Sequence, residues 1–197
     1  MKLIFSTLLT FLMATILMAG NPVKPVTYKV DPAISKIEWT AYKMTGQHNG
    51  TLQVKSGSLE FNGNKLTGGK FDIDMNSLAI TDIQGAMMER LLGHLKNDDF
   101  FSVDKFGTSS LVIKKAEQKS ATLYKITADL IIKGISKEIT FDAVINQAEG
   151  NASASLKVDR TLFDIKYRSG KFFPEIGDKM IKDEFDLKVN LTFAKSV

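Results

Sequence analysis

The chain contains no cysteine, and among its 197 residues there are only 2 histidines and 4 prolines. The lack of cysteine excludes a disulfide scaffold, a thiolate metal site and a cysteine nucleophile. Two histidines cannot form a three-histidine zinc site. With 44% hydrophobic residues and so little proline, the sequence is also unlike a disordered or collagen-like chain. These features indicate one compact domain with a generous core and few side chains suited to catalysis.

The sequence also lacks a large excess of either charge. Lysine and arginine total 26 and aspartate and glutamate total 22, which gives a formal net charge of +4 at pH 7. Acidic and basic residues are interleaved along the chain, and no basic stripe marks a nucleic-acid surface. We therefore expect no nucleic-acid partner.

The first 20 residues have the pattern of a secretory signal peptide. Lys2 is followed by an apolar run over residues 3–17, and small residues then precede Asn21. A membrane anchor is the alternative, although the run is shorter than the about 20 residues that a spanning helix needs. We expect residues 1–20 to be a signal peptide, so that residues 21–197 form a periplasmic or secreted domain.

Beyond the leader, apolar and polar residues alternate in several runs, which is the pattern of strands with one apolar face. The clearest run lies at residues 184–193, where apolar and polar residues alternate throughout. Other runs lie at residues 37–42, 52–54, 59–61, 71–76, 111–113, 126–133, 139–146 and 152–158. About eight or nine antiparallel strands of this kind must close into a barrel or pack as a sandwich. The length of several runs favours a mainly β fold, an antiparallel barrel of about eight strands.

One segment has helical spacing instead. Within Gly85–Lys96, the apolar residues fall on one face of a helix: Met87, Met88, Leu91, Leu92 and Leu95. Turn residues separate the strands at Asn49-Gly50, Asn62-Gly63, Gly134 and Glu149-Gly150-Asn151. The sequence therefore predicts one short helix and tight turns at these places.

The apolar faces combine bulky and small side chains. The bulky ones are Trp39, Phe71, Phe141 and Phe185, and the small ones are Ala41, Ala128, Ala143, Ala152 and Ala154. The interior of an eight-stranded barrel is just wide enough to be filled by side chains or to hold one ligand. The many alanines favour space for a ligand, whereas close interdigitation of large and small residues would give a filled core. The sequence leaves both alternatives open.

Two cations continue the inward faces beyond their apolar parts. Lys43 follows the run at residues 37–41, and Arg160 follows the run at residues 152–158. Because an unpaired charge is costly inside a barrel, both are expected near one end. There they could hold the polar head of an amphiphilic ligand. Alternatively, Arg160 could pair with Asp183 and close that end.

No catalytic motif is complete in the sequence. A Gly-x-Ser-x-Gly nucleophile elbow is absent, and Gly63–Lys70 only approximates a phosphate-binding loop. His94 could serve a serine–histidine–acid hydrolase, but its position within the predicted helix favours a structural or surface role. We expect no catalytic residue, no metal site and no cofactor, and we do not expect an enzyme.

Several motifs together resemble those of one family. Asp31, Ser35, Trp39 and Lys43 follow one another at intervals of four residues. Further motifs follow at residues 68–78 (GGKFDIDMNSL), 93–101 (GHLKNDDFF), 128–137 (ADLIIKGISK), 159–165 (DRTLFDI) and 181–191. Because these motifs cover nearly the whole mature chain in the expected order, the chain resembles the YceI-like domain family.

The resemblance implies a lipocalin-like antiparallel β-barrel that holds a long-chain isoprenoid or similar amphiphilic lipid in its bore. It also implies a non-enzymatic role in binding, storing or transporting that lipid in the bacterial cell envelope. The partners to expect are the lipid, a membrane or acceptor protein that is contacted transiently, and a second copy of the chain in a homodimer. A secreted β-sandwich that serves as an adhesion or carbohydrate-binding module is the alternative.

Within such a barrel, the residues expected to contact the ligand are those at inward positions. We expect the bore to be lined by Trp39, Ala41, Phe71, Ile73, Ala128, Leu130, Phe141 and Leu187. Lys43 and Arg160 are expected near the polar head of the ligand.

Overall fold

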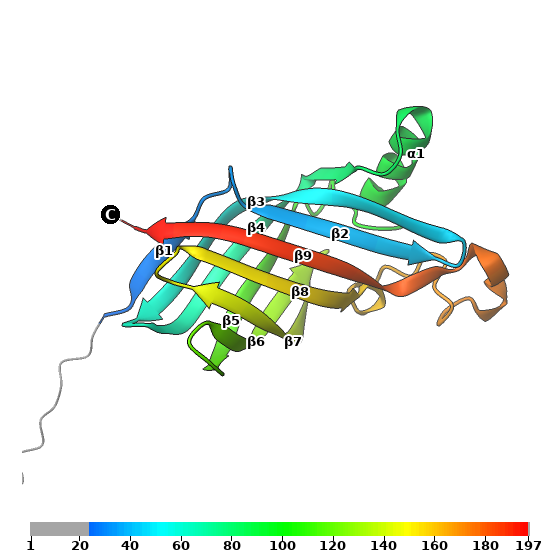
Figure 1. The fold of residues 1–197 in the computed structure, drawn as a ribbon. Helices are drawn as coiled ribbons and strands as arrows, with labels where there is room; N and C mark the ends of the chain where they lie inside the picture. Colours follow the sequence, from blue (N-terminus) through cyan, green and yellow to red (C-terminus); the bar gives the residue numbers. More distant parts are fainter. Residues whose placement is uncertain (1–23, 197) are drawn as a thin grey trace, which may run out of the picture.

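A computed structural model describes residues 24–196, which form a closed antiparallel β-barrel with one α-helix at one end (Figure 1). The strands are β1 (Val26–Val30), β2 (Lys36–Lys43), β3 (Gly46–Asn62), β4 (Lys65–Ile80), β5 (Thr108–Gln118), β6 (Leu123–Ile132), β7 (Ile135–Asn146), β8 (Asn151–Asp159) and β9 (Ile181–Lys195). The helices are α1 (Gly85–Lys96) and the short 3₁₀ segments η1 (Arg160–Phe163) and η2 (Pro174–Lys179). The expected signal peptide lies outside the described residues.

The barrel has eight strand positions, although it contains nine strands. The hydrogen-bonded order is β3-β2-β9-β8-β7-β6-β5-β4, and pairing between β4 and β3 closes the ring. β1 and β2 share one position between β3 and β9: β1 pairs with the far end of β3, and β2 pairs with its beginning. The expected barrel of about eight strands with one short helix is therefore confirmed, and the closed ring excludes the β-sandwich.

The alternating pattern of the sequence places apolar side chains inside and polar side chains outside. In β9, Leu187 faces inward between its partners Trp39 and Leu156 on the neighbouring strands. Its neighbour Asp186 faces outward and accepts hydrogen bonds at 2.7 Å from Tyr42 Oη and Lys157 Nζ. Such alternation is what a sheet with one solvated face requires.

The turn predicted at Asn49-Gly50 is wrong, because both residues lie inside β3. The β2–β3 turn is instead formed by Met44 and Thr45. Gly50 is required for close approach: a Cβ atom there would collide with the carbonyl oxygen of Ala79 and lie 2.5 Å from the indole ring of Trp39.

The other predicted turns are present. Lys133 and Gly134 link β6 to β7 with φ angles of 51° and 72°, as a two-residue hairpin turn requires. Gly63 lies in the β3–β4 turn, and Gly150 ends the β7–β8 turn. The helix predicted at Gly85–Lys96 has the predicted bounds. Within residues 24–196, no helix combines the length and the hydropathy of a membrane span.

Candidate functional site

The barrel encloses an elongated apolar cavity of about 150 Å³. Its wall is formed by side chains from every strand from β2 to β9, together with Phe101 from the segment between α1 and β5. All lining residues are apolar except Ser109, Ser110 and Ser153. An ordered water occupies roughly 10–15 Å³ on this scale, so the cavity is about ten waters in size but offers almost no polar partners. It is suited to an apolar ligand.

The cavity extends along the strands rather than forming a round pocket. Four successive inward residues of β9 line it: Phe185, Leu187, Val189 and Leu191. At about 3.4 Å per residue, this row corresponds to about 20 Å of strand. The shape matches a linear hydrocarbon chain better than a compact ring system.

Aromatic side chains close the barrel at the end that contains β1, which we call the β1 end. Tyr28 packs edge-on against Phe61 and Phe193, with ring centroids 5.2 and 5.8 Å away. Gln147 Nε2 donates a hydrogen bond of 3.1 Å to Tyr28 Oη, and Phe61 and Phe193 are buried. A ligand that passed through this end would have to displace a packed aromatic cluster.

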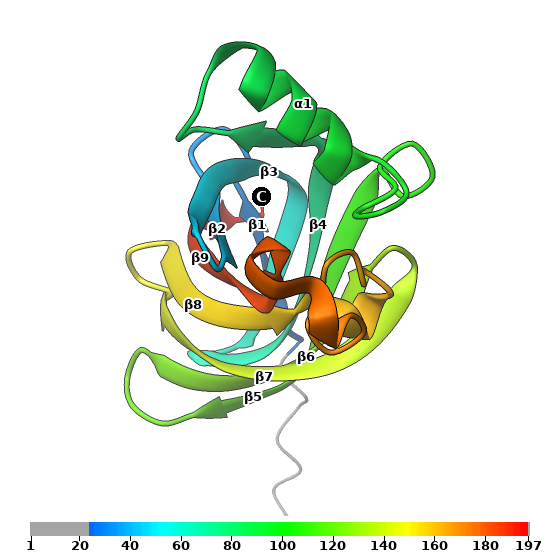
Figure 2. The ribbon, with the colours of Figure 1, turned by 90° about the vertical axis from the view of Figure 1, so that its right-hand side faces the viewer.

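The opposite end, which we call the α1 end, is covered by α1, η1, η2 and the segment after α1 (Figure 2). Under α1, Trp39, Leu78 and Ile80 form a buried cluster with the apolar face of the helix. Beside it, Phe163 and Ile165 of the η1 region are fully buried against β6 and β8. This end is therefore also filled by side chains.

The wall of the barrel is interrupted between β7 and β8. These strands pair only from Ala143–Ala154 to Asn146–Asn151. The preceding part of β7 (135–142) and the following part of β8 (155–159) have no pairing with each other in the described part of the chain. By contrast, β6 and β7 are paired along nearly their full lengths. We call the unpaired stretch between β7 and β8 the lateral seam.

The lateral seam borders the cavity directly. Phe141 of β7 and Leu156 of β8 line the cavity on either side of the seam, and both are only half-buried although they face inward. On β8 the seam comprises residues 155–159, whose apolar side chains are Leu156 and Val158. The buried Phe163 and Ile165, which follow β8 in the chain, belong to one apolar cluster with Leu156 of β8 and Ile139 of β7. The two sides of the seam are therefore joined by side-chain packing and not by ladder hydrogen bonds.

Five of the residues expected to contact the ligand lie together around the cavity: Phe71, Ile73, Leu130, Phe141 and Leu187. Ala128 faces the same interior but is fully buried in the packed core beside the cavity. Trp39 and Ala41 lie under α1 and not on the cavity wall. The indole Nε1 of Trp39 is buried and has no hydrogen-bond partner among residues 24–196.

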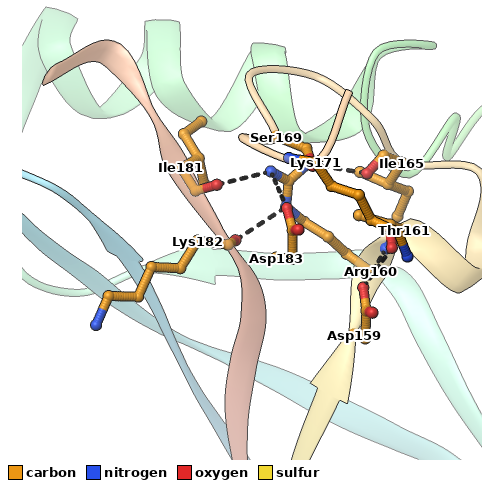
Figure 3. Close-up of polar contacts among 9 residues, drawn as sticks. All are labelled: Asp159, Arg160, Thr161, Ile165, Ser169, Lys171, Ile181, Lys182 and Asp183. Atoms are coloured by element: carbon orange, nitrogen blue, oxygen red, sulfur yellow. Dashed lines mark hydrogen bonds and ion pairs between the residues drawn. The ribbon is translucent and has the colours of Figure 1, made fainter. Parts of the chain in front are cut away.

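The two expected head-group cations differ in their surroundings. The guanidinium of Arg160 is buried and donates hydrogen bonds to the carbonyl oxygens of Ile165 (2.8 Å), Ile181 (3.0 Å) and Lys182 (3.1 Å) (Figure 3). Its Nη2 atom lies 3.6 Å from Asp183 Oδ1. Burial lowers the pKa of Arg160, and the charge of Asp183 opposes this shift.

These contacts give Arg160 a structural role at the α1 end. Arg160 joins the loop after η1 to the beginning of β9. This agrees with the alternative in which Arg160 pairs with Asp183 and closes this end of the barrel. Lys43 is exposed at the end of β2, beside Ile181 in the ladder. The side chain of Lys43 is therefore open to a polar group, whereas the guanidinium of Arg160 is occupied by backbone carbonyls.

His94 lies in α1, where its Nε2 atom is 3.1 Å from Asp99 Oδ2. Its ring packs edge-on against Tyr167 and Phe100, with centroids 4.5 and 5.0 Å away. These contacts join α1 to the loop that follows η1, as expected for a structural histidine.

The sequence analysis did not name every residue that lines the cavity. Most of the unnamed ones lie at alternate positions of the same strands, on the inward face. Leu156, Phe185 and Val189 are examples, and the alternation itself could have identified them. Phe101 is different, because it comes from a loop that the packing of α1 brings over the interior. No sequence period marks it.

Comparison with known proteins agrees with this architecture. A family model described as the YceI-like domain matches residues 28–193. Curated UPF0312 proteins of Staphylococcus aureus, for example from strain N315, are 43% identical over 58 residues, which is 29% of this chain and 31% of the relative. The match spans about a third of the length of these curated relatives.

Solved structures are similar in fold. BcnA of Burkholderia cenocepacia has a TM-score of 0.65 at 20% identity, over 82% of this chain and 98% of that chain. A polyisoprenoid binding domain from Saccharophagus degradans has a TM-score of 0.59 at 14% identity, over 87% of this chain and 99% of that chain. A YCEI protein of Campylobacter jejuni has a TM-score of 0.53 at 21% identity, over 97% of this chain and 94% of that chain.

Proposed function

The chain belongs to the YceI-like domain family, and from that premise we propose that it binds the apolar chain of a long isoprenoid or similar amphiphilic lipid inside its barrel. The observation that carries the proposal is the elongated apolar cavity between β2 and β9. A protein of the same fold, from Saccharophagus degradans, is named a polyisoprenoid binding domain, which supports this ligand class.

The energetics favour a carrier or storage role over rapid sensing. Burial of one methylene contributes about 0.8 kcal/mol, so the roughly ten methylenes that a space of about ten waters can hold represent on the order of 8 kcal/mol of gross transfer free energy. The loss of ligand and protein freedom on binding offsets a large part of this. A long apolar chain released into water would expose all of its methylenes, so delivery is proposed to use a membrane or an acceptor protein.

We infer that the ligand enters through the lateral seam. Opening a paired stretch of two neighbouring strands would break ladder hydrogen bonds, each of which contributes about 1 kcal/mol net. At the seam, no such bonds join β7 residues 135–142 to β8 residues 155–159. Both ends of the barrel are filled by buried aromatic and aliphatic clusters, which makes them poorer routes.

The polar head of the ligand remains outside the apolar cavity in this account, because burying a charged head without partners is costly. Lys43 at the α1 end is exposed and is proposed to interact with the head. We propose no catalytic step, since binding alone accounts for the cavity. A role in the cell envelope rests on the leader pattern at residues 1–20.

Extraction of the purified protein with organic solvent, followed by mass spectrometry, tests the proposal. The protein is produced in several bacterial hosts, and each preparation is expected to yield a long-chain lipid in near-stoichiometric amount. A cysteine-free β-protein of another fold, purified in parallel, controls for lipid carried over from the membrane. Extracts without lipid from every host would contradict the proposal.

A further inference from the structure

Exposed large apolar side chains concentrate at the α1 end of the barrel. Among the described residues, this end exposes Met44, Leu162, Phe172 and Phe173. Phe172 is 42% exposed and Phe173 is 50% exposed. Exposed phenylalanines side by side on a protein surface indicate an interaction site more strongly than single scattered apolar residues do.

Cations surround these phenylalanines. Residues 166–173 read Lys-Tyr-Arg-Ser-Gly-Lys-Phe-Phe, with no acidic residue among them, and we call them the basic–aromatic patch. The ammonium groups of Lys166 and Lys171 lie 5.4 and 6.0 Å from the centroid of the Phe172 ring. The guanidinium of Arg168 lies 5.2 Å from the centroid of the Tyr167 ring. Charge and apolar surface therefore occupy the same small area.

Part of this charge is not neutralised within the protein. Lys166 forms a short ion pair with Asp164, at 2.6 Å. In contrast, neither Arg168 nor Lys171 has a carboxylate within 4.0 Å in the part of the chain that the structure describes. Two cations beside two exposed phenylalanines are thus available to an anionic partner.

The patch is held in place by the folded loop. Ser169 is fully buried, and its carbonyl oxygen accepts hydrogen bonds from the backbone N–H groups of Phe172 (3.2 Å) and Phe173 (2.8 Å). The carbonyl oxygen of Arg168 accepts a hydrogen bond of 2.9 Å from the backbone N–H of Ile181, at the start of β9. The phenylalanines are therefore presented outward by a loop anchored to the barrel.

We propose that the basic–aromatic patch docks the barrel on a bilayer that contains anionic phospholipids. Phe172 and Phe173 enter the boundary between head groups and acyl chains, while Arg168 and Lys171 contact the lipid phosphates. Aromatic and apolar side chains beside lysine and arginine are the combination that binds such interfaces. An acidic protein surface would satisfy the cations, but it would leave the exposed phenylalanine pair without a matching environment.

The patch lies close to the lateral seam, so docking would bring the seam to the membrane. This step rests on the proposed lipid-binding function. The unpaired part of β8 ends at Asp159, where η1 begins, and the patch follows shortly afterwards in the same end of the barrel. A barrel docked through the patch holds the lateral seam close to the lipid surface. The hydrocarbon chain can then pass between membrane and cavity with little exposure to water.

Co-sedimentation of the purified protein with vesicles tests the proposal. One set of vesicles contains phosphatidylcholine alone, and the other contains phosphatidylcholine mixed with phosphatidylglycerol. We expect binding to the mixed vesicles, which weakens as salt is added, and much weaker binding to phosphatidylcholine alone. The double variant Phe172→Ser/Phe173→Ser and the single variant Lys171→Glu are each expected to bind the mixed vesicles at least tenfold more weakly.

Matched control variants lie at the β1 end. Ile34→Ser changes another exposed apolar residue (64% exposed), and Lys65→Glu reverses an exposed lysine at the start of β4. Both are expected to bind vesicles like the unmodified protein, and circular dichroism verifies the fold of all variants. Equal binding of the patch and control variants, or no binding to anionic vesicles, would overturn the proposal.

The same preparations separate this proposal from the proposed function. Each variant is also extracted with solvent and its lipid content is measured. Loss of vesicle binding with the lipid content retained supports the docking patch. A protein that contains lipid but does not bind anionic vesicles contradicts docking and leaves the lipid-binding function intact. Patch-dependent vesicle binding without any extractable lipid supports docking and contradicts the lipid-binding function.

Discussion

Ala143 of β7 and Ala154 of β8 form the last pair between their strands, and from this pair onward the two strands continue without pairing to each other. Both alanines line the cavity. The wall of the barrel therefore loses its hydrogen bonds at the point where it is also lined by small side chains. This coincidence is the physical basis for placing ligand entry at the lateral seam.

A disulfide across the seam is expected to block ligand entry. Asp142→Cys and Ser155→Cys introduce cysteines one position beyond the Ala143–Ala154 pair, on the outer surface. Since the chain contains no other cysteine, only one disulfide can form. We expect the oxidised variant to take up a fluorescent prenyl lipid at least tenfold more slowly, with full recovery after reduction.

The control disulfide joins strands that are already paired. Ser155→Cys and Lys188→Cys lie opposite each other on β8 and β9, and both native side chains are exposed and absent from the cavity wall. Oxidation of this variant is expected to leave uptake unchanged, and thiol titration verifies that both disulfides have formed. If the two oxidised variants take up lipid equally fast, the seam is not the route of entry.

A large side chain at Ala154 is expected to fill the cavity. Ala154→Phe places a ring on the cavity wall, and we expect at least tenfold less lipid to be recovered from the folded variant. Asn190→Phe adds the same ring to the outside of β9 and is expected to leave recovery unchanged. Equal recovery from both variants would show that the cavity does not hold the lipid.

The sequence predicts Ala128 on the bore, and the structure places Ala154 on the cavity wall, but a phenylalanine should affect stability differently at the two positions. Ala128 is fully buried in packed core, so Ala128→Phe would force neighbouring side chains to move. Overpacking of this kind costs about 1–3 kcal/mol. We expect this variant to lower the free energy of unfolding, measured by urea denaturation, whereas Ala154→Phe lowers it less.

Loss of the Arg160 side chain is expected to destabilise the α1 end. Arg160→Met leaves three backbone carbonyls without their donors and Asp183 without its ion-pair partner. Breaking a buried network of this kind costs about 3–5 kcal/mol. Lys43→Met, which alters an exposed cation at the same end, should change the free energy of unfolding by less than about 0.5 kcal/mol. Chemical denaturation of both variants compares these effects.

Acid should weaken the fold partly through Asp186. Hydrogen bonds from Lys157 and then from Tyr42 hold the pKa of this carboxyl below its usual range. The folded pKa lies below the unfolded value of about 3.9, so the contribution is complete above that value and is lost as the pH falls through the folded pKa. Asp186→Asn should reduce the dependence of the free energy of unfolding on pH below about pH 4. Parallel pH profiles for the variant and the unmodified protein would contradict this assignment.

The sequence predicts the parts of this fold that depend on periodicity. Strand alternation identified inward residues such as Leu187 and Phe141, and the helical spacing of five apolar residues gave the bounds of α1. Periodicity is reliable here because each element buries one face only. It cannot show how far two strands remain paired, and the lateral seam therefore emerged only from the structure.

Residues with unusual neighbours were harder to predict. Gly50 was assigned to a turn because Asn-Gly commonly forms one, but its requirement for glycine comes from the ring of Trp39 and the carbonyl of Ala79. For Arg160 the sequence predicted either a place near a ligand head or a pair with Asp183, and the structure shows the pair. Its further partners are carbonyls up to 22 residues away in sequence, which no local pattern reveals.

Photo-crosslinking tests the central claim, that the lipid chain lies inside the barrel, most directly. The protein is loaded with a prenyl lipid that carries a photoreactive group at the end of its tail, irradiated, digested and mapped by mass spectrometry. We expect labels on inward residues of the cavity, such as Leu156, Leu187 and Phe141. Labels confined to outward residues such as Lys188 and Asn190 would contradict the claim.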